Sequence, residues 1–152
     1  MPRLEPLCLF RADLKEPVDV GAGPFGVRRI FDVAGGRVEG ERISGRVLPS
    51  GGDWLLIGSD GVGRLDVRAT LETDDGAYVY AQYYGVLVFD EAVVAALGSG
   101  AETAFGESHF MTAPRFETGD PRYAWLNAVV AVGQGRLLPG AVEYRVFEAV
   151  ND

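Results

Sequence analysis

Short runs of β-forming residues recur along the whole chain and are separated by residues that favour turns. Gly35-Gly36, Asp60-Gly61 and Asp75-Gly76 are such separators, because glycine adopts a positive φ at little steric cost. Evenly spaced short strands with turns between them are typical of an all-β sandwich or barrel. We expect strands at Leu4–Phe10, Val27–Val33, Arg42–Leu48, Trp54–Gly58, Arg64–Glu72, Tyr78–Val88, Ser108–Thr112, Tyr123–Gly133 and Val142–Ala149.

One helix is expected between these strands. Asp90 is a suitable N-cap, the apolar residues 92–97 form the body, and Gly98 can end the helix. A helix of less than three turns suits one end of a barrel better than a separate layer. The 152 residues show no change of composition that would mark a linker. We therefore expect residues 1–152 to form a single all-β domain, an antiparallel closed β-barrel of about eight to ten strands with one short helix.

The charge balance argues against some classes of partner. Twenty-two acidic and fourteen basic residues give a net charge of -8, and the basic residues are scattered. Nucleic acid is therefore not expected as a partner, because binding to its backbone needs a cationic patch. No apolar run approaches the roughly 20 residues of a membrane span, so we expect no membrane partner. Residues 1–6 lack the apolar core of a secretory signal, so the expected location is the cytoplasm.

We expect no cofactor. Cys8 is the only cysteine and His109 the only histidine, so one chain cannot assemble a disulfide or a zinc site of several nitrogen or sulfur ligands. Residues 21–26 match the dinucleotide pattern G-x-G-x-x-G, but Pro24 lies inside the pattern and a β-type run follows where a helix is required. A glycine-rich bend is the favoured interpretation.

The region Arg64–Val88 contains two β-runs joined by Asp-Asp-Gly, which suits a three-residue hairpin loop with Gly76 in the left-handed conformation. This turn would pair Glu72 with Tyr78 and Asp66 with Tyr84. Alternate side chains point the same way. One face would hold Asp66, Arg68, Thr70, Glu72, Tyr78, Tyr80, Gln82 and Tyr84, and the other Leu65, Val67, Ala69, Leu71, Val79 and Ala81. A two-residue turn would shift the register by one residue and regroup both faces.

The polar face of this hairpin has two interpretations. It is either the solvated outside of the sheet or the wall of a partly solvated pocket. Three tyrosines, at positions 78, 80 and 84, are more aromatic surface than a solvated face usually carries, which favours the pocket.

Three further groups of residues are candidates for a site. Tyr123, Trp125 and Asn127 alternate on an expected strand, although Trp125 is equally compatible with core packing. Asp53-Trp54 begins a strand, where Asp53 is either a general base or the residue of an Asx turn. His109 is more often structural at such a position.

Several motifs in this order resemble one known family, and together they cover nearly the whole chain. They are Gly51-Gly52-Asp53-Trp54, Asp66-Val67-Arg68 with the following Thr73-Asp74-Asp75-Gly76-Ala77, Phe116-Glu117-Thr118, and Tyr123-Ala124-Trp125-Leu126-Asn127. The chain resembles domain-of-unknown-function family 3237, also called uncharacterised protein family 0311. The resemblance implies a small β-barrel, frequently dimeric, without a well-established general activity. It also implies an aromatic-Phe-Arg-Thr run where this chain has His109-Phe110-Met111-Thr112.

The expected function is a cofactor-independent enzyme, a lyase, isomerase or cyclase that moves protons on a hydrophobic oxygenated metabolite. A carboxylate, Asp53, Asp66 or Glu72, would take the proton. Arg68 would stabilise enolate charge and Tyr84 or Tyr123 would donate a proton. The expected substrate-binding residues are Trp54, Asp66, Glu72, Tyr80, Gln82, His109, Trp125 and Asn127.

Two alternatives remain open, a non-catalytic barrel that binds a small ligand and a purely structural homodimer. We expect a homodimer in any case, because the run Tyr123–Gly133 is apolar on one face and aromatic on the other, and Leu65–Leu71 offers a face of small and apolar residues.

Overall fold

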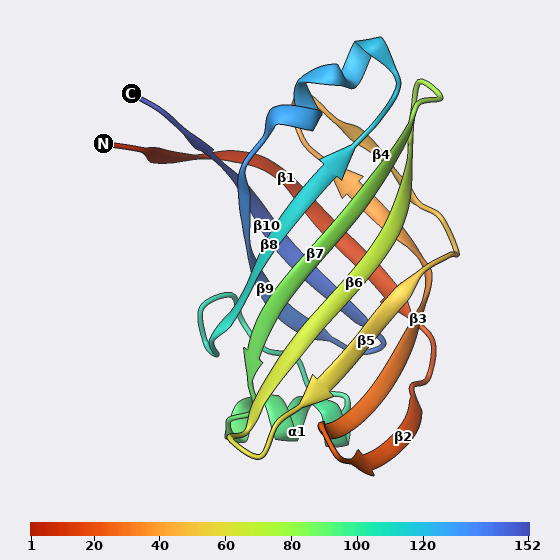
Figure 1. The fold of residues 1–152 in the computed structure, drawn as a ribbon, viewed down its shortest axis with the longest axis vertical. Coiled ribbons are helices and arrows are strands. Elements are labelled where there is room, and N and C mark those ends of the chain that lie inside the picture. Colours follow the sequence, from red (N-terminus) through yellow and green to blue (C-terminus); the bar gives the residue numbers. More distant parts are fainter.

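Ten antiparallel strands curve into one ring-like sheet in the computed structural model, which describes residues 1–152 (Figure 1). The elements are β1 (Arg3–Leu14), β2 (Val18–Gly23), β3 (Gly26–Glu39), β4 (Ser44–Val47), β5 (Gly52–Ile57), β6 (Val62–Thr73), β7 (Tyr78–Val88), α1 (Glu91–Ser99), β8 (Phe110–Glu117), η1 (Pro121–Ala128), β9 (Ala131–Leu138) and β10 (Ala141–Val150). The predicted all-β barrel is confirmed.

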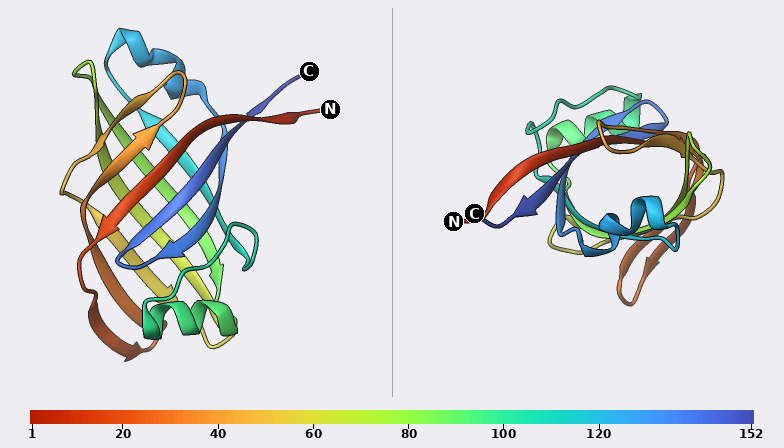
Figure 2. Two further views of the ribbon diagram at one scale, coloured as in Figure 1. Left: turned by 180° about the vertical axis from the view of Figure 1, so that it is seen from behind. Right: turned by 90° about the horizontal axis from the view of Figure 1, so that it is seen from above.

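The pairing of β1 with β3 closes the ring. The sheet runs in the order β1-β10-β9-β8-β7-β6-β4-β3-β2, and the additional β1–β3 pairing joins the two sides. β5 also pairs with β3 and β6, so β4 and β5 share one place in the ring at opposite ends of the barrel. The view from above shows the ring enclosing the lumen, with η1 over one end (Figure 2). No helix in the structure is both long enough and apolar enough to span a membrane.

The predicted register of the β6–β7 hairpin is confirmed. Glu72 pairs with Tyr78 and Asp66 with Tyr84, and Gly76 has a φ of 89° in the turn. The apolar face, which includes Leu71 and Val79, is buried inside the barrel. The polar face therefore points outward and does not line the lumen.

α1 covers the lower end of the barrel (Figure 1) and agrees closely with the predicted helix. The Asp90 side chain accepts a hydrogen bond from the backbone N–H of Val93, which is the predicted N-cap. The helix ends two residues later than expected, because Gly100 and not Gly98 adopts the left-handed C-cap conformation, and Gly98 remains helical. Val93 and Ala96 are buried, and they place the helix against the barrel end.

The predicted strand Tyr123–Gly133 is wrong over most of its length. Residues 121–128 form the 3-10 helix η1, and strand β9 starts only at Ala131. Asp120 caps η1 by accepting a hydrogen bond from Arg122 N, and Pro121 occupies the first turn. The buried residues of η1 are Tyr123 and Leu126, which are three positions apart. This spacing is the period of a 3-10 helix and not the two-residue alternation of a strand.

The features on which the expected homodimer rested are not outward sheet faces. Tyr123–Gly133 is mostly η1, and the Leu65–Leu71 side chains of the apolar face point into the barrel. The homodimer stays a prediction. Residues 21–26 span the turn between β2 and β3, and a strand follows them, as the glycine-rich-bend interpretation requires.

The β8–β9 seam is the sparsest in the ring. Only Met111–Gln134 and Thr112–Gly133 pair across it. Two glycines of β9 leave room for side chains of β8. A Cβ at Gly135 would lie 2.7–2.9 Å from the Phe110 ring, and one at Gly133 would lie 2.4 Å from Thr112 Oγ1. Side chains of β8 therefore pack closely over the glycines of β9 at this seam.

We predict that Gly135→Ala destabilises the protein by about 1–3 kcal/mol, because the added methyl group overpacks the Phe110 ring. Urea denaturation measures the change. The matched control is Gly98→Ala in α1, where an added Cβ meets no atom within 4 Å. That substitution should leave stability unchanged or raise it by up to about 1 kcal/mol. Equal effects of the two substitutions would contradict the role of Gly135.

Candidate functional site

A cavity of about 360 Å³ opens at the α1 end of the barrel, and we call it the lumen pocket. Twelve of its twenty lining residues are hydrophobic. The lining comprises Leu14 at the end of β1 with the following residues 15–17, Arg29 and Phe31 of β3, Asp53 and Leu55 of β5, Leu65, Leu87, three residues at the end of α1 (Ala96, Leu97 and Gly100), Phe110, and residues 137–142, which include the β9–β10 turn and the adjoining ends of both strands. A concave apolar cavity with few polar groups is the usual form of a small-molecule site.

Asp53 is the carboxylic acid on the β-strand wall of this pocket. It lies on β5 opposite Phe31 of β3 and Val67 of β6, and Val67 is a core residue. The strand alternation that sends Leu55 into the core sends Asp53 into the lumen as well, while Trp54 between them points outward.

The backbone around Asp53 departs from a regular ladder. β5 and β6 pair at Asp53–Val67 and again at Leu56–Arg64, with an interruption between these pairs. The carbonyl of Trp54 accepts a hydrogen bond from Arg28 Nη1 at 2.7 Å. The backbone N–H of Asp66 instead donates to Asp53 Oδ1 at 3.1 Å. The interruption therefore supplies a backbone donor that holds the carboxyl group of Asp53.

Burial raises the pKa of Asp53 to about 7. The hydrogen bond from the Asp66 backbone and the positive charge of Arg28 lower the pKa, and the charge of the Asp66 carboxylate raises it. Asp66 Oδ1 is itself buried without a hydrogen-bond partner. With a pKa near neutrality, Asp53 exists in both protonation states at physiological pH and can accept or release a proton.

An aromatic cluster fills the lumen beside Asp53. The rings of Tyr83 and Tyr144 lie 5.2 Å apart in an edge-to-face arrangement, and Phe10 and Phe110 pack against Tyr144 in the same way. Burial raises the pKa of both tyrosines, and the charge of Asp53 raises each further. Asp53 thus lies close to two neutral phenols in a water-poor interior.

Of the predicted site residues, Asp53 is the one that lines the lumen pocket. Tyr84 is 58% exposed, Trp54 is 38% exposed and Arg68 is exposed, all on the outside of the barrel. Glu72 forms an outer ion pair with Arg46 at 2.9 Å. Asp66 contributes its backbone N–H to Asp53 rather than its carboxylate.

Tyr80, Gln82 and Asn127 line a second, polar hollow on the outer surface, with a volume of about 420 Å³. The amide of Asn127 fixes the chain beyond β8, because its Oδ1 accepts from Thr118 N and its Nδ2 donates to Thr118 O. Trp125 stacks on the Arg42 guanidinium at 4.0 Å. Of the predicted site residues, Asp53 therefore lines the lumen pocket, whereas Tyr80, Gln82 and Asn127 lie at the outer hollow.

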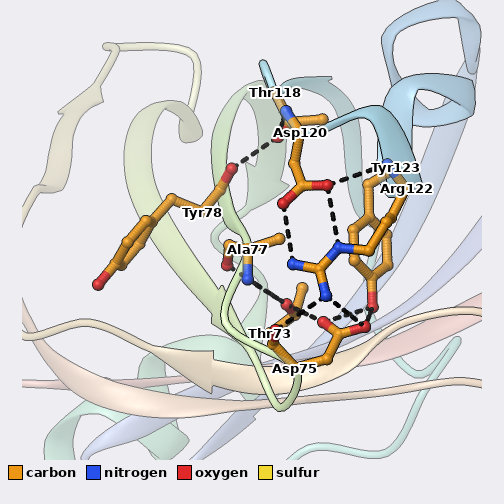
Figure 3. A network of polar contacts seen from close by, with 8 residues as sticks. All are labelled: Thr73, Asp75, Ala77, Tyr78, Thr118, Asp120, Arg122 and Tyr123. Carbon is orange, nitrogen blue, oxygen red and sulfur yellow. Dashed lines mark hydrogen bonds and ion pairs between the residues drawn. The ribbon is translucent and has the colours of Figure 1, made fainter.

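Tyr123 anchors the tip of the β6–β7 hairpin to η1 (Figure 3). Its hydroxyl donates to the carboxylate of Asp75, with both O–O distances at 2.9 Å. Arg122 donates to the Asp75 carbonyl at 3.0 Å, and the Thr118 hydroxyl donates to the Tyr78 carbonyl at 2.7 Å. This network lies at the end of the barrel opposite α1, so Tyr123 is far from the lumen pocket.

His109 and Met111, where the sequence departs from the pattern of the resembled family, do not line the lumen pocket. Both are exposed, whereas Phe110 between them is buried and lines it. The expectation that His109 binds substrate gains no support from this placement.

Sequence reasoning missed Arg29, Phe31, Tyr83 and Tyr144 around the lumen, and it missed Arg28, whose charge lowers the pKa of Asp53. Tyr83 continues the apolar face of the predicted hairpin, beyond Val79 and Ala81. Extending that alternation by one residue would have identified it. Arg29 and Phe31 share one face of a predicted strand, but nothing in the sequence shows which face is inside.

Comparison with known proteins gives consistent matches over the whole chain. Residues 2–149 match the family model described as "Protein of unknown function (DUF3237)". A UPF0311 protein of Rhodopseudomonas palustris is 38% identical over 134 residues, which are 87% of this chain and 88% of the relative. A crystal structure of a conserved protein of the same organism has a TM-score of 0.92 at 33% identity and covers 99% of both chains. These matches confirm the family resemblance.

More distant matches come from fungi. A protein of Penicillium roqueforti named PR-toxin biosynthesis cluster protein 7 is 26% identical over 157 aligned residues, covering 91% of this chain and 84% of the relative. The structure of an enzyme from Penicillium herquei shares the fold, with a TM-score of 0.69 at 23% identity over 98% of this chain and 95% of that one.

No group of three or more His, Cys, Asp or Glu side chains is arranged to hold a metal ion.

We predict that Asp53 makes stability depend on pH. An aspartate in the unfolded chain ionises near pH 4, whereas folded Asp53 ionises near pH 7. Between these values the unfolded chain has released the proton and the folded protein retains it, so stability falls as the pH rises from about 4 to about 7. This difference in pKa corresponds to at most about 4 kcal/mol.

Asp53→Asn removes this titration. Its free energy of unfolding, relative to that of the wild type, should be higher at pH 8 than at pH 4.5, by up to about 3 kcal/mol. Urea denaturation at the two pH values measures the difference. The same relative stability at both pH values would show that Asp53 ionises normally.

We predict that Tyr123→Phe lowers the melting temperature by about 2–4 °C, because the substitution removes a hydrogen bond to a carboxylate while keeping the ring packed. Tyr84→Phe is the control, since its exposed hydroxyl makes only a 3.5 Å contact with Gln82. An unchanged melting temperature for Tyr123→Phe would show that the Asp75 contact contributes nothing.

Proposed function

This chain belongs to the DUF3237 family, and we propose that it is an enzyme that transfers protons on a small, mainly apolar, oxygenated molecule held in the lumen pocket. The observation that carries the proposal is Asp53, a half-buried carboxylic acid with a pKa of about 7 on the wall of a mostly hydrophobic cavity. An acid–base catalyst is most effective when its pKa is close to the working pH. The reaction class is a lyase, isomerase or cyclase.

Asp53 is the proposed proton carrier. In its ionised form it takes a proton from an acidic C–H or O–H group of the substrate, and in its protonated form it returns a proton to a different atom. The hydrogen bond from Asp66 N to Asp53 Oδ1 fixes the carboxyl group, which leaves the other oxygen, Oδ2, for the substrate. The hydrophobic lining excludes water, which strengthens the interactions of a developing charge.

The catalytic roles predicted from sequence for Arg68, Tyr84 and Tyr123 do not enter this proposal, because none of the three lines the lumen pocket. The name of the Penicillium roqueforti relative refers to a biosynthesis cluster, which supports a role in small-molecule metabolism. The second candidate is a non-catalytic carrier, which the hydrophobic lining favours equally.

We predict that the protein catalyses hydrogen exchange on a bound carbonyl compound or phenol and that Asp53 is required. Incubation with a panel of cyclic and aryl ketones, enones and phenols in D₂O, followed by NMR, detects deuterium that enters the molecule. Asp53→Asn should reduce the protein-dependent rate by about 10²–10⁴-fold. For proton abstraction, the wild-type rate should rise with pH through about 7, the pKa of Asp53.

Arg68→Met is the matched control, because Arg68 lies outside the barrel, and its exchange rate should equal that of the wild type. Full activity of Asp53→Asn would show that the catalytic site lies elsewhere in the protein. Compounds that bind to the wild-type protein without any protein-dependent exchange would identify a carrier.

A further inference from the structure

We propose that the molecule bound in the lumen pocket is an amphiphilic anion, with an apolar body inside the barrel and a single carboxylate held at the mouth by Arg29 and Lys15. This inference rests on the proposed function only in taking the lumen pocket as the site. It specifies the substrate class, which the acid–base argument leaves open.

Arg29 is a cation that faces the lumen. It lies on β3 opposite Leu55, a core residue that is 4% exposed, and both line the pocket. The strand alternation places Phe31 and Val33 on the same inner face. Arg29 forms neither an ion pair nor a side-chain hydrogen bond within the protein, although a guanidinium has five N–H donors.

This lack of a partner sets Arg29 apart from most arginines of the chain. Eight arginines form ion pairs with carboxylates. Arg28 donates to the Trp54 carbonyl, and Arg145 donates to Gln134. Arg68 and Arg115 are also unpaired, but both are exposed on the outside of the barrel. Arg29 alone presents an unpaired guanidinium to a mainly apolar cavity, where a ligand anion would satisfy its donors.

Lys15 adds a second cation at the mouth. Its backbone N–H donates to the Asp32 carbonyl at 2.9 Å, which ties the segment after β1 to β3 one residue beyond Phe31, and Lys15 itself lines the pocket. Glu16 is the one acid at this rim, and like Lys15 it is exposed without an ion pair. Arg29 and Lys15 are the two cations of the pocket lining, against Glu16 at the rim and Asp53 on the wall, in a protein whose net charge is -8. The attraction for an anion therefore comes from the guanidinium of Arg29 and the ammonium of Lys15 and not from the overall charge of the protein.

The apolar body of the ligand follows from the cavity. An apolar cavity of about 150 Å³ accommodates benzene. The lumen pocket holds about 360 Å³, enough for a body of roughly two fused rings. Phe31 lies two residues beyond Arg29 along β3 and pairs with Asp53. Two residues of a strand span about 6.6 Å, which separates the anionic head from the atoms that reach Asp53.

The test compares 2-naphthoate with the neutral 2-naphthylmethanol, measured by calorimetry with wild-type protein at pH 7.5. We expect the acid to bind about 10- to 100-fold more tightly, because it gains a charge-assisted hydrogen bond to Arg29. Arg29→Met should abolish this preference and leave the affinity for the alcohol unchanged. Arg29→Lys should retain part of the preference. Lys15→Met should reduce the preference further, both in the wild-type protein and in Arg29→Lys.

Arg115→Met is the control, because it removes an equally unpaired arginine from the outside of the barrel and should leave both affinities unchanged. A wild-type protein that binds the alcohol as tightly as the acid, or binds neither, overturns the proposal. So does an Arg29→Met protein that keeps the preference. Asp53→Asn separates the two proposals, since it should keep the preference for the acid while losing exchange. A preference without any exchange in the wild type would refute the proposed function alone.

Discussion

Closure of the sheet by the β1–β3 pairing is the constraint on which the rest of the structure depends. In a closed ring each strand has one face toward the lumen and one toward solvent. Alternate side chains of every strand therefore point into the lumen or out to solvent. It also gives the lumen two ends with different chemistry. α1 and the β9–β10 turn border the open pocket at one end, whereas η1 and the hairpin network cover the other.

The acid–base chemistry proposed for the lumen pocket depends on one carboxylic acid placed among apolar residues. Asp53 occupies an inner position between strands whose inner residues are mostly hydrophobic, and burial raises its pKa to about 7. The same burial disfavours its charged form in the folded protein, so the site costs stability at neutral pH. Such a cost is expected where a group serves chemistry rather than folding.

Much of the fold was predictable because local rules determine it. Asp-Asp-Gly fixed the register of β6–β7, and Asp90 fixed the start of α1. The inner and outer faces were not predictable in the same way, because three tyrosines on an outward face resemble a pocket lining in sequence. η1 was missed since its capping residues, Asp120 and Pro121, precede a run that also reads as a strand. Arg28 approaches Trp54 across 26 residues, a contact that no local pattern reveals.

The interrupted ladder between β5 and β6 affects which substitutions near Asp53 the protein tolerates. Asp53 is held by the backbone N–H of Asp66 and not by a neighbouring side chain. Every amino acid except proline carries that donor, so substitutions at position 66 preserve the orientation of the acid. The geometry of the acid is encoded in the path of the main chain, and the residues around it are free to diverge toward different ligands without displacing it.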